Sequence, residues 1–244
     1  MNETAAPAAA GYSVVNALID IVAAPAKALD EVKHRSRWLW WPLAISVLSF
    51  IAVFAFYYSW VDFDWMIDDL ARASVPPGED PSAVAQQMRA FMSPGVQIGM
   101  TAFGIVVMTF LIYAIQSAYL HIVNRVTGDP GIRYGQWFSF SAWTAFVGIF
   151  NAIAVLAVIL MAESNQLSAN DLTPLSINSL LLHAEPGETW FTWGNSLTLV
   201  HFWMLGLMAL GFSRWTGSSM GKSVAVVVAP WALIFGIWAL LIVL

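Results

Sequence analysis

Residues 38–60 read WLWWPLAISVLSFIAVFAFYYSW and contain no Asp, Glu, Lys or Arg. An α-helix needs about 20 apolar residues to cross the hydrocarbon core of a bilayer, which is about 30 Å thick. Hydrocarbon offers the backbone no water to bond, so a helix, which satisfies its own N–H and C=O groups, is the stable form of such a stretch. Residues 38–60 therefore predict a membrane-spanning helix.

Four further stretches share this character, so the predicted fold is an all-α polytopic membrane protein, a bundle of five transmembrane helices. No stretch contains an Asp, Glu, Lys or Arg, each of which would cost about 2.5–3.5 kcal/mol at the centre of a spanning helix. The predicted spans are residues 38–60, 95–120, 134–162, 191–212 and 223–244, which together form a membrane domain of residues 38–244.

The composition of the whole chain agrees with a lipid environment. Of the 244 residues, 59% are hydrophobic and 10% are charged, and the mean hydropathy is +0.70. Soluble proteins contain about 25% charged residues. The chain has no cysteine, which excludes disulfides, thiolate metal sites and cysteine nucleophiles.

The charges between the predicted spans alternate in sign. Most of the ten basic residues share one side of the membrane: Lys27, Lys33, Arg35, Arg37, Arg125, Arg133, Arg214 and Lys222. Most of the fifteen acids share the other: Asp62, Asp64, Asp68, Asp69, Glu79, Asp80, Glu163, Asp171, Glu185 and Glu188. Because basic connections stay in the cytoplasm, the sequence predicts a multi-pass membrane protein with a cytoplasmic N-terminus and Leu244 outside.

Tryptophans gather near the predicted span ends, where their amphipathic rings favour the headgroup level. We expect nine of the thirteen to be interfacial anchors. These are Trp38, Trp40, Trp41, Trp60, Trp65, Trp137, Trp190, Trp193 and Trp215.

The segments outside the spans have amphipathic patterns. Residues 1–11 predict a disordered tail, and residues 12–37 predict a cytoplasmic amphipathic helix bent at Pro25. Its apolar face is formed by Val14, Leu18, Ile21, Val22, Leu29 and Val32. This helix is expected either to lie in the membrane interface or to pack against the ends of the spans. The outer connection, 61–94, predicts two short amphipathic helices separated by a proline-rich turn.

A small intramembrane polar site is the main functional candidate. His201 lies near the middle of the fourth predicted span, and an ionisable side chain at that depth marks a functional candidate that needs a partner. Asn151, deep in the third predicted span, is the expected partner, with Thr198 nearby. The alternative is a hydrogen bond between helices that serves packing alone.

Other motifs predict no catalytic, metal or cofactor site. Residues 216–223, TGSSMGKS, resemble a phosphate-binding loop, but they begin with Thr and lie between two spans, so no nucleotide is expected. The histidines show no metal-ligand spacing, and no Ser–His or Asp pair occupies a matched depth. We therefore expect no enzyme activity and no nucleic acid partner.

Small residues predict close helix packing. Gly95 and Gly99 open the second predicted span, and Gly206 and Gly211 lie late in the fourth. Small side chains let helices approach closely, so these positions are candidates for packing within the bundle or for association with a second copy or another membrane protein.

In the order of its parts, the chain resembles the bacterial branch of the Yip1 family. The shared features are Leu18-Ile19-x-Ile21 with Pro25 and Leu29, the segments 38–42, 133–138 and 141–145, a turn at 128–131, and the segment 203–211 followed by a Ser/Lys turn at 218–223. The resemblance covers residues 14–244 and implies a five-helix bundle with a cytoplasmic N-terminus. Eukaryotic members act in vesicle trafficking and contact prenylated Rab GTPases and one another. Bacterial relatives have no settled activity.

Two functions remain open at this point. The first is a non-enzymatic factor that organises the membrane or binds other proteins. The second is a small transporter or lipid-handling protein with a polar path near Asn151, His201 and Thr198.

Overall fold

The computed structural model describes residues 11–76, 78–127 and 131–244, so ten of the eleven residues of the predicted tail lie outside it. In this part of the chain the structure is helical, with one isolated β-bridge. The α-helices are α1 (Val14–Ala23), α2 (Pro25–Lys33), α3 (Trp40–Trp60), α4 (Phe63–Ala73), α5 (Ser82–Phe91), α6 (Pro94–Thr127), α7 (Tyr134–Ala145), α8 (Ile149–Met161), α9 (Phe191–Ser196), α10 (Leu199–Thr216) and α11 (Met220–Val243). Short 3₁₀ turns occupy Ser36–Leu39, Phe146–Gly148 and Ala169–Asp171, and a π-helical turn occupies Asn178–Leu182.

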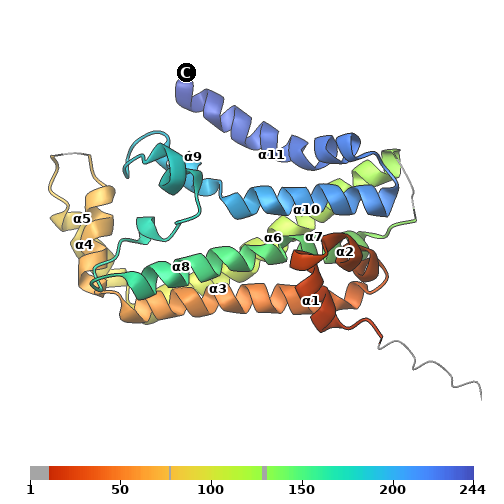
Figure 1. The fold of residues 1–244 in the computed structure, drawn as a ribbon. Helices are drawn as coiled ribbons and strands as arrows, with labels where there is room; N and C mark the ends of the chain where they lie inside the picture. The colour runs from red at the N-terminus through yellow and green to blue at the C-terminus, as the bar shows by residue number, and fades with distance from the viewer. Residues whose placement is uncertain (1–10, 77, 128–130) are drawn as a thin grey trace, which may run out of the picture.

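The long helices form a bundle (Figure 1). In the described residues, four helical segments are long and apolar enough to cross a membrane: Ser36–Trp60, Pro94–Val126, Tyr134–Met161 and Met220–Val243. These segments coincide with four of the five predicted spans. The chain is therefore a helical, multi-pass membrane protein.

The structure corrects the remaining predicted span, 191–212. This stretch is not one helix, because the chain becomes extended at Leu197 and Thr198 and separates α9 from α10. The helix α10 has 18 residues and reaches about 27 Å at 1.5 Å per residue.

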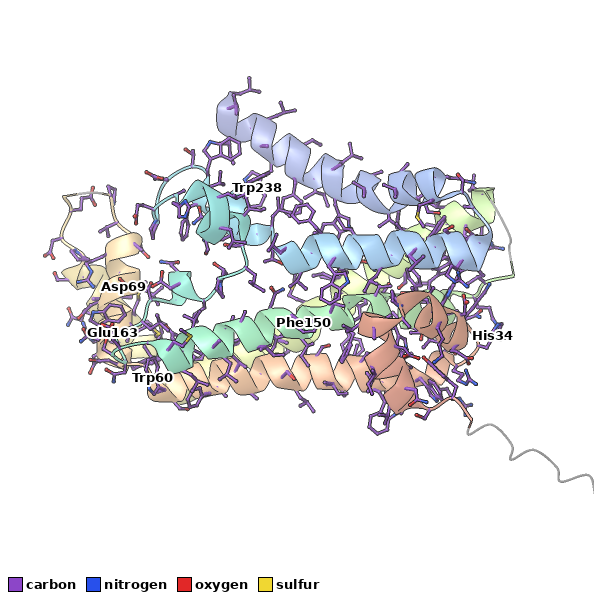
Figure 2. All side chains as sticks on the ribbon, in the orientation of Figure 1. His34, Trp60, Asp69, Phe150, Glu163 and Trp238 are labelled. Atoms are coloured by element: carbon purple, nitrogen blue, oxygen red, sulfur yellow. The ribbon has the colours of Figure 1, made fainter. Side chains whose placement is uncertain are left out.

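The two predicted outer helices are present as α4 and α5, which pack against each other beyond one end of the bundle (Figure 1). Asp69 and Glu163 lie at this end, whereas His34 lies at the opposite end (Figure 2). The acidic connections and the basic N-terminal segment thus occupy opposite ends of the bundle, as the alternation of charge predicts.

The N-terminal helices pack against the end of the bundle that carries His34. In α2, Leu29 and Val32 are fully buried in the core shared with α7 and α10. Lys33 Nζ donates to the carbonyl oxygen of Trp215 (2.8 Å), and Trp215 Nε1 donates to that of Leu29 (2.9 Å). An ion pair between Asp30 and Arg214 adds a third polar link between α2 and α10, with Arg214 Nε 2.7 Å from Asp30 Oδ1.

The Asp30–Arg214 pair predicts a pH dependence of stability. The hydrogen bond from Arg214 lowers the pKa of the Asp30 carboxyl below its ordinary value. Because the folded-state pKa is lowered, the stabilisation is complete above the unfolded-state pKa and disappears as the pH falls through the folded-state value. We expect the wild-type melting temperature in detergent to fall more than that of Asp30→Asn between pH 7 and pH 3. Parallel curves for the two proteins would contradict this, and the difference will be small because both side chains are partly exposed.

A tyrosine of α6 compensates for the proline inside α11. Pro230 has no N–H, so the Val226 carbonyl one turn earlier loses its helical partner. The Tyr119 hydroxyl donates to that carbonyl oxygen at 2.8 Å. Figure 1 shows that the C-terminal half of α11 diverges from α10.

This compensation can be tested with a double-mutant cycle. We expect Tyr119→Phe to reduce the free energy of unfolding by about 0.6–2 kcal/mol, because the Val226 carbonyl then has no donor in lipid. In a Pro230→Ala background the alanine N–H can bond Val226, so the same Tyr119→Phe change should cost markedly less. Equal losses in the two backgrounds, measured by denaturant titration in micelles, would contradict the assignment.

The structure also corrects two of the predicted tryptophan anchors. Trp137 and Trp215 are buried and pack with Phe140 and Phe212, with ring centroids 4.9–5.6 Å apart across the contacting pairs. We call these four residues the aromatic cluster. It joins α7 to α10 directly beneath α2, so these two indoles serve packing rather than contact with lipid headgroups.

Candidate functional site

The candidate site is built around the break between α9 and α10. Thr198 is the N-cap of α10, and its hydroxyl oxygen accepts a hydrogen bond from the His201 backbone N–H at 3.2 Å. Threonine is a favoured N-cap because its side chain satisfies an N–H that has no partner within the helix. The helix α10 therefore begins at Leu199, inside the stretch that average hydropathy predicted as a single span.

The backbone at the break pairs with the connection that precedes α9. Residues 175–177 run antiparallel to residues 197–199, with Ile177 N–H donating to Leu197 O (2.7 Å) and Leu199 N–H donating to Leu175 O (2.9 Å). Non-helical backbone is tolerated at membrane depth only where it is buried in protein or lines a cavity. These two bonds satisfy backbone groups that the interrupted helix leaves open.

A cluster of polar side chains links residues 173–179 to α9, beside the backbone pairing. The amide oxygen of Asn195 accepts hydrogen bonds from the hydroxyls of Thr173 (2.9 Å) and Ser176 (3.0 Å). The Ser179 hydroxyl donates to the carbonyl oxygen of Thr173 at 2.8 Å. Sequence reasoning missed Thr173, Ser176 and Ser179 because they lie in a connection that the span pattern treats as external, and it placed Asn195 inside the predicted span 191–212. The succession Gly194-Asn195-Ser196 ahead of Thr198 was the available signal, since such residues favour turns and helix starts.

Of the three predicted site residues, Asn151 and Thr198 lie next to each other. Asn151 Nδ2 lies 3.5 Å from Thr198 Oγ1, at the long limit of a hydrogen bond. Phe150, the neighbour of Asn151, lies midway along the bundle (Figure 2).

A cavity of about 210 Å³ lies beside this pair. Polar side chains of Asn151, Thr173 and Thr198 line part of its wall, and the rest is apolar, with Phe50 and Phe54 of α3 opposite. Because most of the wall is apolar, the cavity suits a small molecule with one or two polar groups or an apolar chain end better than a hydrated ion.

His201 is turned away from this cavity. Its ring lies edge-on to Trp231 of α11, with centroids 4.4 Å apart, and 6.2 Å from the ring of Phe235. The buried Nε2 has no hydrogen-bond partner among the described residues. The structure therefore differs from the expected pairing of His201 with Asn151, because successive faces of α10 point toward α8 and toward α11.

The connection between α8 and α9, residues 162–190, is bonded to α3 and α4 at the acidic end of the bundle. The Tyr57 hydroxyl donates to the carbonyl oxygen of Leu167 (2.8 Å), and the Ser168 hydroxyl donates to the Asp69 carboxylate (2.7 Å). Burial, followed by the nearby charges of Asp69 and Glu185, raises the pKa of the Asp171 carboxyl above its ordinary value.

The four candidate packing glycines differ in their surroundings. A Cβ at Gly95, Gly99 or Gly206 would meet nothing within 4 Å, whereas one at Gly211 would overlap Phe140 Cε2 and lie 3.3 Å from Leu29 Cδ1. Gly211 thus lies where α2, α7 and α10 meet, whereas the other three glycines are not in close contact with another helix of this chain.

Residues 216–223 comprise the last residue of α10, a short turn at 217–219 and the first turn of α11. Gly217 ends α10 with a φ of +70°, a value that glycine adopts without strain, and the Ser219 side chain caps the start of α11. No strand precedes this turn in the described residues, so the geometry differs from that of a phosphate-binding loop.

Comparison with known proteins identifies the family. No curated protein and no solved structure matches the chain. A family model described as the Yip1 domain matches residues 19–241, which include the second half of α1, the whole of α2, the bundle and the α9–α10 break. The chain therefore belongs to the Yip1 family of membrane proteins.

Proposed function

We propose that this protein is a non-enzymatic membrane-organising factor that acts by inserting α1 into the cytoplasmic leaflet of the bacterial inner membrane. The observation that carries the proposal is the outward face of α1. Val15, Ile19 and Val22 follow one another at helical spacing and are 58%, 61% and 38% exposed. The opposite face buries Ala17 and Ile21 completely against the bundle.

The position of α1 suits an interfacial helix. In Figure 1, α1 runs across the direction of the spans, at the end of the bundle where α3 begins. The exposed indoles of Trp40 and Trp41 lie in the first turn of α3 and favour the headgroup level. A helix held in this plane with an apolar stripe outward enters the boundary between headgroups and acyl chains, and so displaces lipid in one leaflet.

Reconstitution into liposomes of phosphatidylethanolamine and phosphatidylglycerol tests this function. We expect wild-type protein to change vesicle size and shape in electron micrographs, and Ile19→Asp to lose this effect because a carboxylate then lies within the stripe. Asn16→Asp places the same charge at an exposed position outside the stripe and should retain the effect. Equal activity of the two variants, at equal incorporation, would refute the role of α1.

The proposal includes an orientation: a cytoplasmic N-terminus, α10 as a fifth crossing and the α4–α5 pair outside. The positive-inside rule and the alternating charges support it. Because the chain has no cysteine, single cysteines report topology without background. With a membrane-impermeant maleimide added to intact spheroplasts, Ser82→Cys should be labelled and Lys27→Cys should be labelled only after lysis. The reverse pattern would overturn the orientation.

The cavity beside Asn151 and Thr198 favours a second candidate function, transport or lipid handling. Many transporters build their binding sites where the helical backbone is interrupted within the membrane and lines a cavity. Lipid scrambling or solute flux in proteoliposomes that is lost in Asn151→Ala and retained in Asn16→Ala, which removes the same side chain from an exposed position on α1, would support it. Flux that is the same in wild type and Asn151→Ala would remove the cavity from consideration.

A further inference from the structure

The end of the bundle that carries His34 (Figure 2) holds an excess of basic side chains, and we call it the basic end. Lys33 is engaged there through its bond to the Trp215 carbonyl oxygen. Among the described residues, every acid of this end is already paired with a cation. The pairs are Asp20–Lys27 (2.8 Å), Glu31–Arg35 and Asp30–Arg214. Cations outside these pairs are therefore available to an anion from outside the chain.

Arg37 and Arg133 are two such cations. Both are exposed, and neither forms an ion pair with another described residue. Arg37 lies in the 3₁₀ turn Ser36–Leu39 ahead of α3, and Arg133 is the N-cap of α7. These two segments pack against each other.

A side-chain bond fixes how the two segments meet. Gln136 Nε2 donates to the Lys33 carbonyl oxygen at 3.0 Å. Gln136 follows Arg133 by three residues, and Lys33 precedes Arg37 by four. The fold thus holds two unpaired guanidinium groups on neighbouring segments, although they are far apart in the sequence.

Exposed aromatic rings place both arginines at the level of the lipid headgroups. Trp40, three residues after Arg37, is 58% exposed, and Tyr134, directly after Arg133, is 41% exposed. Tryptophan and tyrosine rings favour the boundary between headgroups and hydrocarbon. The phosphates of the bilayer therefore lie within reach of both guanidinium groups.

The chemistry of this surface fits a phospholipid better than a free phosphate. A guanidinium group presents its N–H donors in a planar fork that matches two phosphate oxygens. The exposed indoles of Trp40 and Trp41 lie beside Arg37 and can contact the acyl chains of the same molecule. A free phosphate gains nothing from this apolar surface.

We propose that Arg37 and Arg133 form a binding site for the phosphate headgroup of an anionic phospholipid such as phosphatidylglycerol. Two positive charges favour a lipid of net negative charge over zwitterionic phosphatidylethanolamine, whose ammonium group they repel. The bound headgroup links the start of α3 to the start of α7. The site uses neither the apolar stripe of α1 nor the cavity beside Asn151, so its failure would leave both proposed functions untouched.

Single substitutions to glutamine test the site. Arg125 provides the matched control, because it is exposed in the last turn of α6, forms no ion pair among the described residues and lies outside the two segments. Native mass spectrometry of the full-length protein in micelles, titrated with phosphatidylglycerol, measures the affinity. We expect Arg37→Gln and Arg133→Gln each to weaken binding about fivefold and the double variant about 25-fold. Arg125→Gln removes the same charge and should bind as wild type does.

Three outcomes would overturn the proposal. Equal weakening by all three single variants would mean a general attraction of anions to the basic end. Equal affinity for phosphatidylglycerol and phosphatidylethanolamine would remove the charge selectivity. Displacement of phosphatidylglycerol by an equal concentration of glycerol 3-phosphate would assign the site to a free phosphate. Melting temperatures of the lipid-free variants check folding, and if the double variant does not fold, the single variants decide the result.

Discussion

Replacing Trp215 by Ala is expected to reduce the free energy of unfolding by about 3–5 kcal/mol, the usual cost of removing a buried tryptophan side chain. Trp215 is 3% exposed and belongs to the aromatic cluster, on which α2 packs. Its indole N–H also bonds the Leu29 carbonyl oxygen. The substitution therefore opens a cavity in the cluster and removes one of the polar links that hold α2 on α10. Denaturant titration in micelles measures the loss, and faster proteolysis within the N-terminal helices shows which part is released.

Two further substitutions separate packing from hydrogen bonding and from lipid contact. Trp215→Phe keeps most of the ring contacts and loses the bond to Leu29, so it should cost about 1 kcal/mol. Trp40→Ala removes an exposed indole and should change stability by no more than about 0.5 kcal/mol. If Trp215→Ala costs no more stability than Trp40→Ala, then Trp215 contacts lipid in the membrane and the buried position described here is wrong.

The contrast between these two tryptophans shows what the sequence determines. Position near a span end places an indole along the membrane normal, and for Trp40 and Trp41 this is sufficient. It does not give the direction of the side chain around the helix. Trp137 and Trp215 point inward because α2 packs over them, and this long-range contact leaves no periodic signal in the sequence around either residue.

The same distinction explains the spans. Helices α3, α6 and α11 follow from composition, because exposure to lipid is a property of each stretch by itself. The break at Leu197 and Thr198 depends on pairing with Leu175 and Ile177, which are close in space but lie much earlier in the chain, in the connection between α8 and α9. Average hydropathy over a window does not detect such a break, although the Gly-Asn-Ser run before Thr198 is a local sequence signal for it.

For the candidate site, the sequence predicted depth and missed direction. Asn151 Nδ2 lies 3.5 Å from Thr198 Oγ1, so these two residues do lie at one level of the bundle. His201, one turn further along α10, faces Trp231 instead. A hydropathy profile gives no rotation about the helix axis, so a partner on α8 and one on α11 were equally compatible with it.

Gly211→Ala is expected to reduce the free energy of unfolding by about 1–3 kcal/mol through overpacking. The added Cβ would overlap Phe140 Cε2 and lie 3.0 Å from Phe140 Cζ. The Phe140 ring has little room to retreat, because it is fully buried and packs against Trp137 and Trp215. Relief therefore requires α10 to move away from α7. Thermal unfolding in detergent measures the loss.

Gly206→Ala is the matched control on the same helix. Its Cβ would meet nothing within 4 Å, and alanine is a better helix former than glycine, so this variant should be neutral or more stable. Combining Gly211→Ala with Phe140→Leu, which removes the obstructing ring atoms, should recover part of the loss beyond the sum of the single effects. Equal destabilisation by the two alanine variants would mean that glycine matters for α10 as a flexible residue. Destabilisation by Gly211→Ala alone, with rescue by Phe140→Leu, would assign it to close packing among α2, α7 and α10.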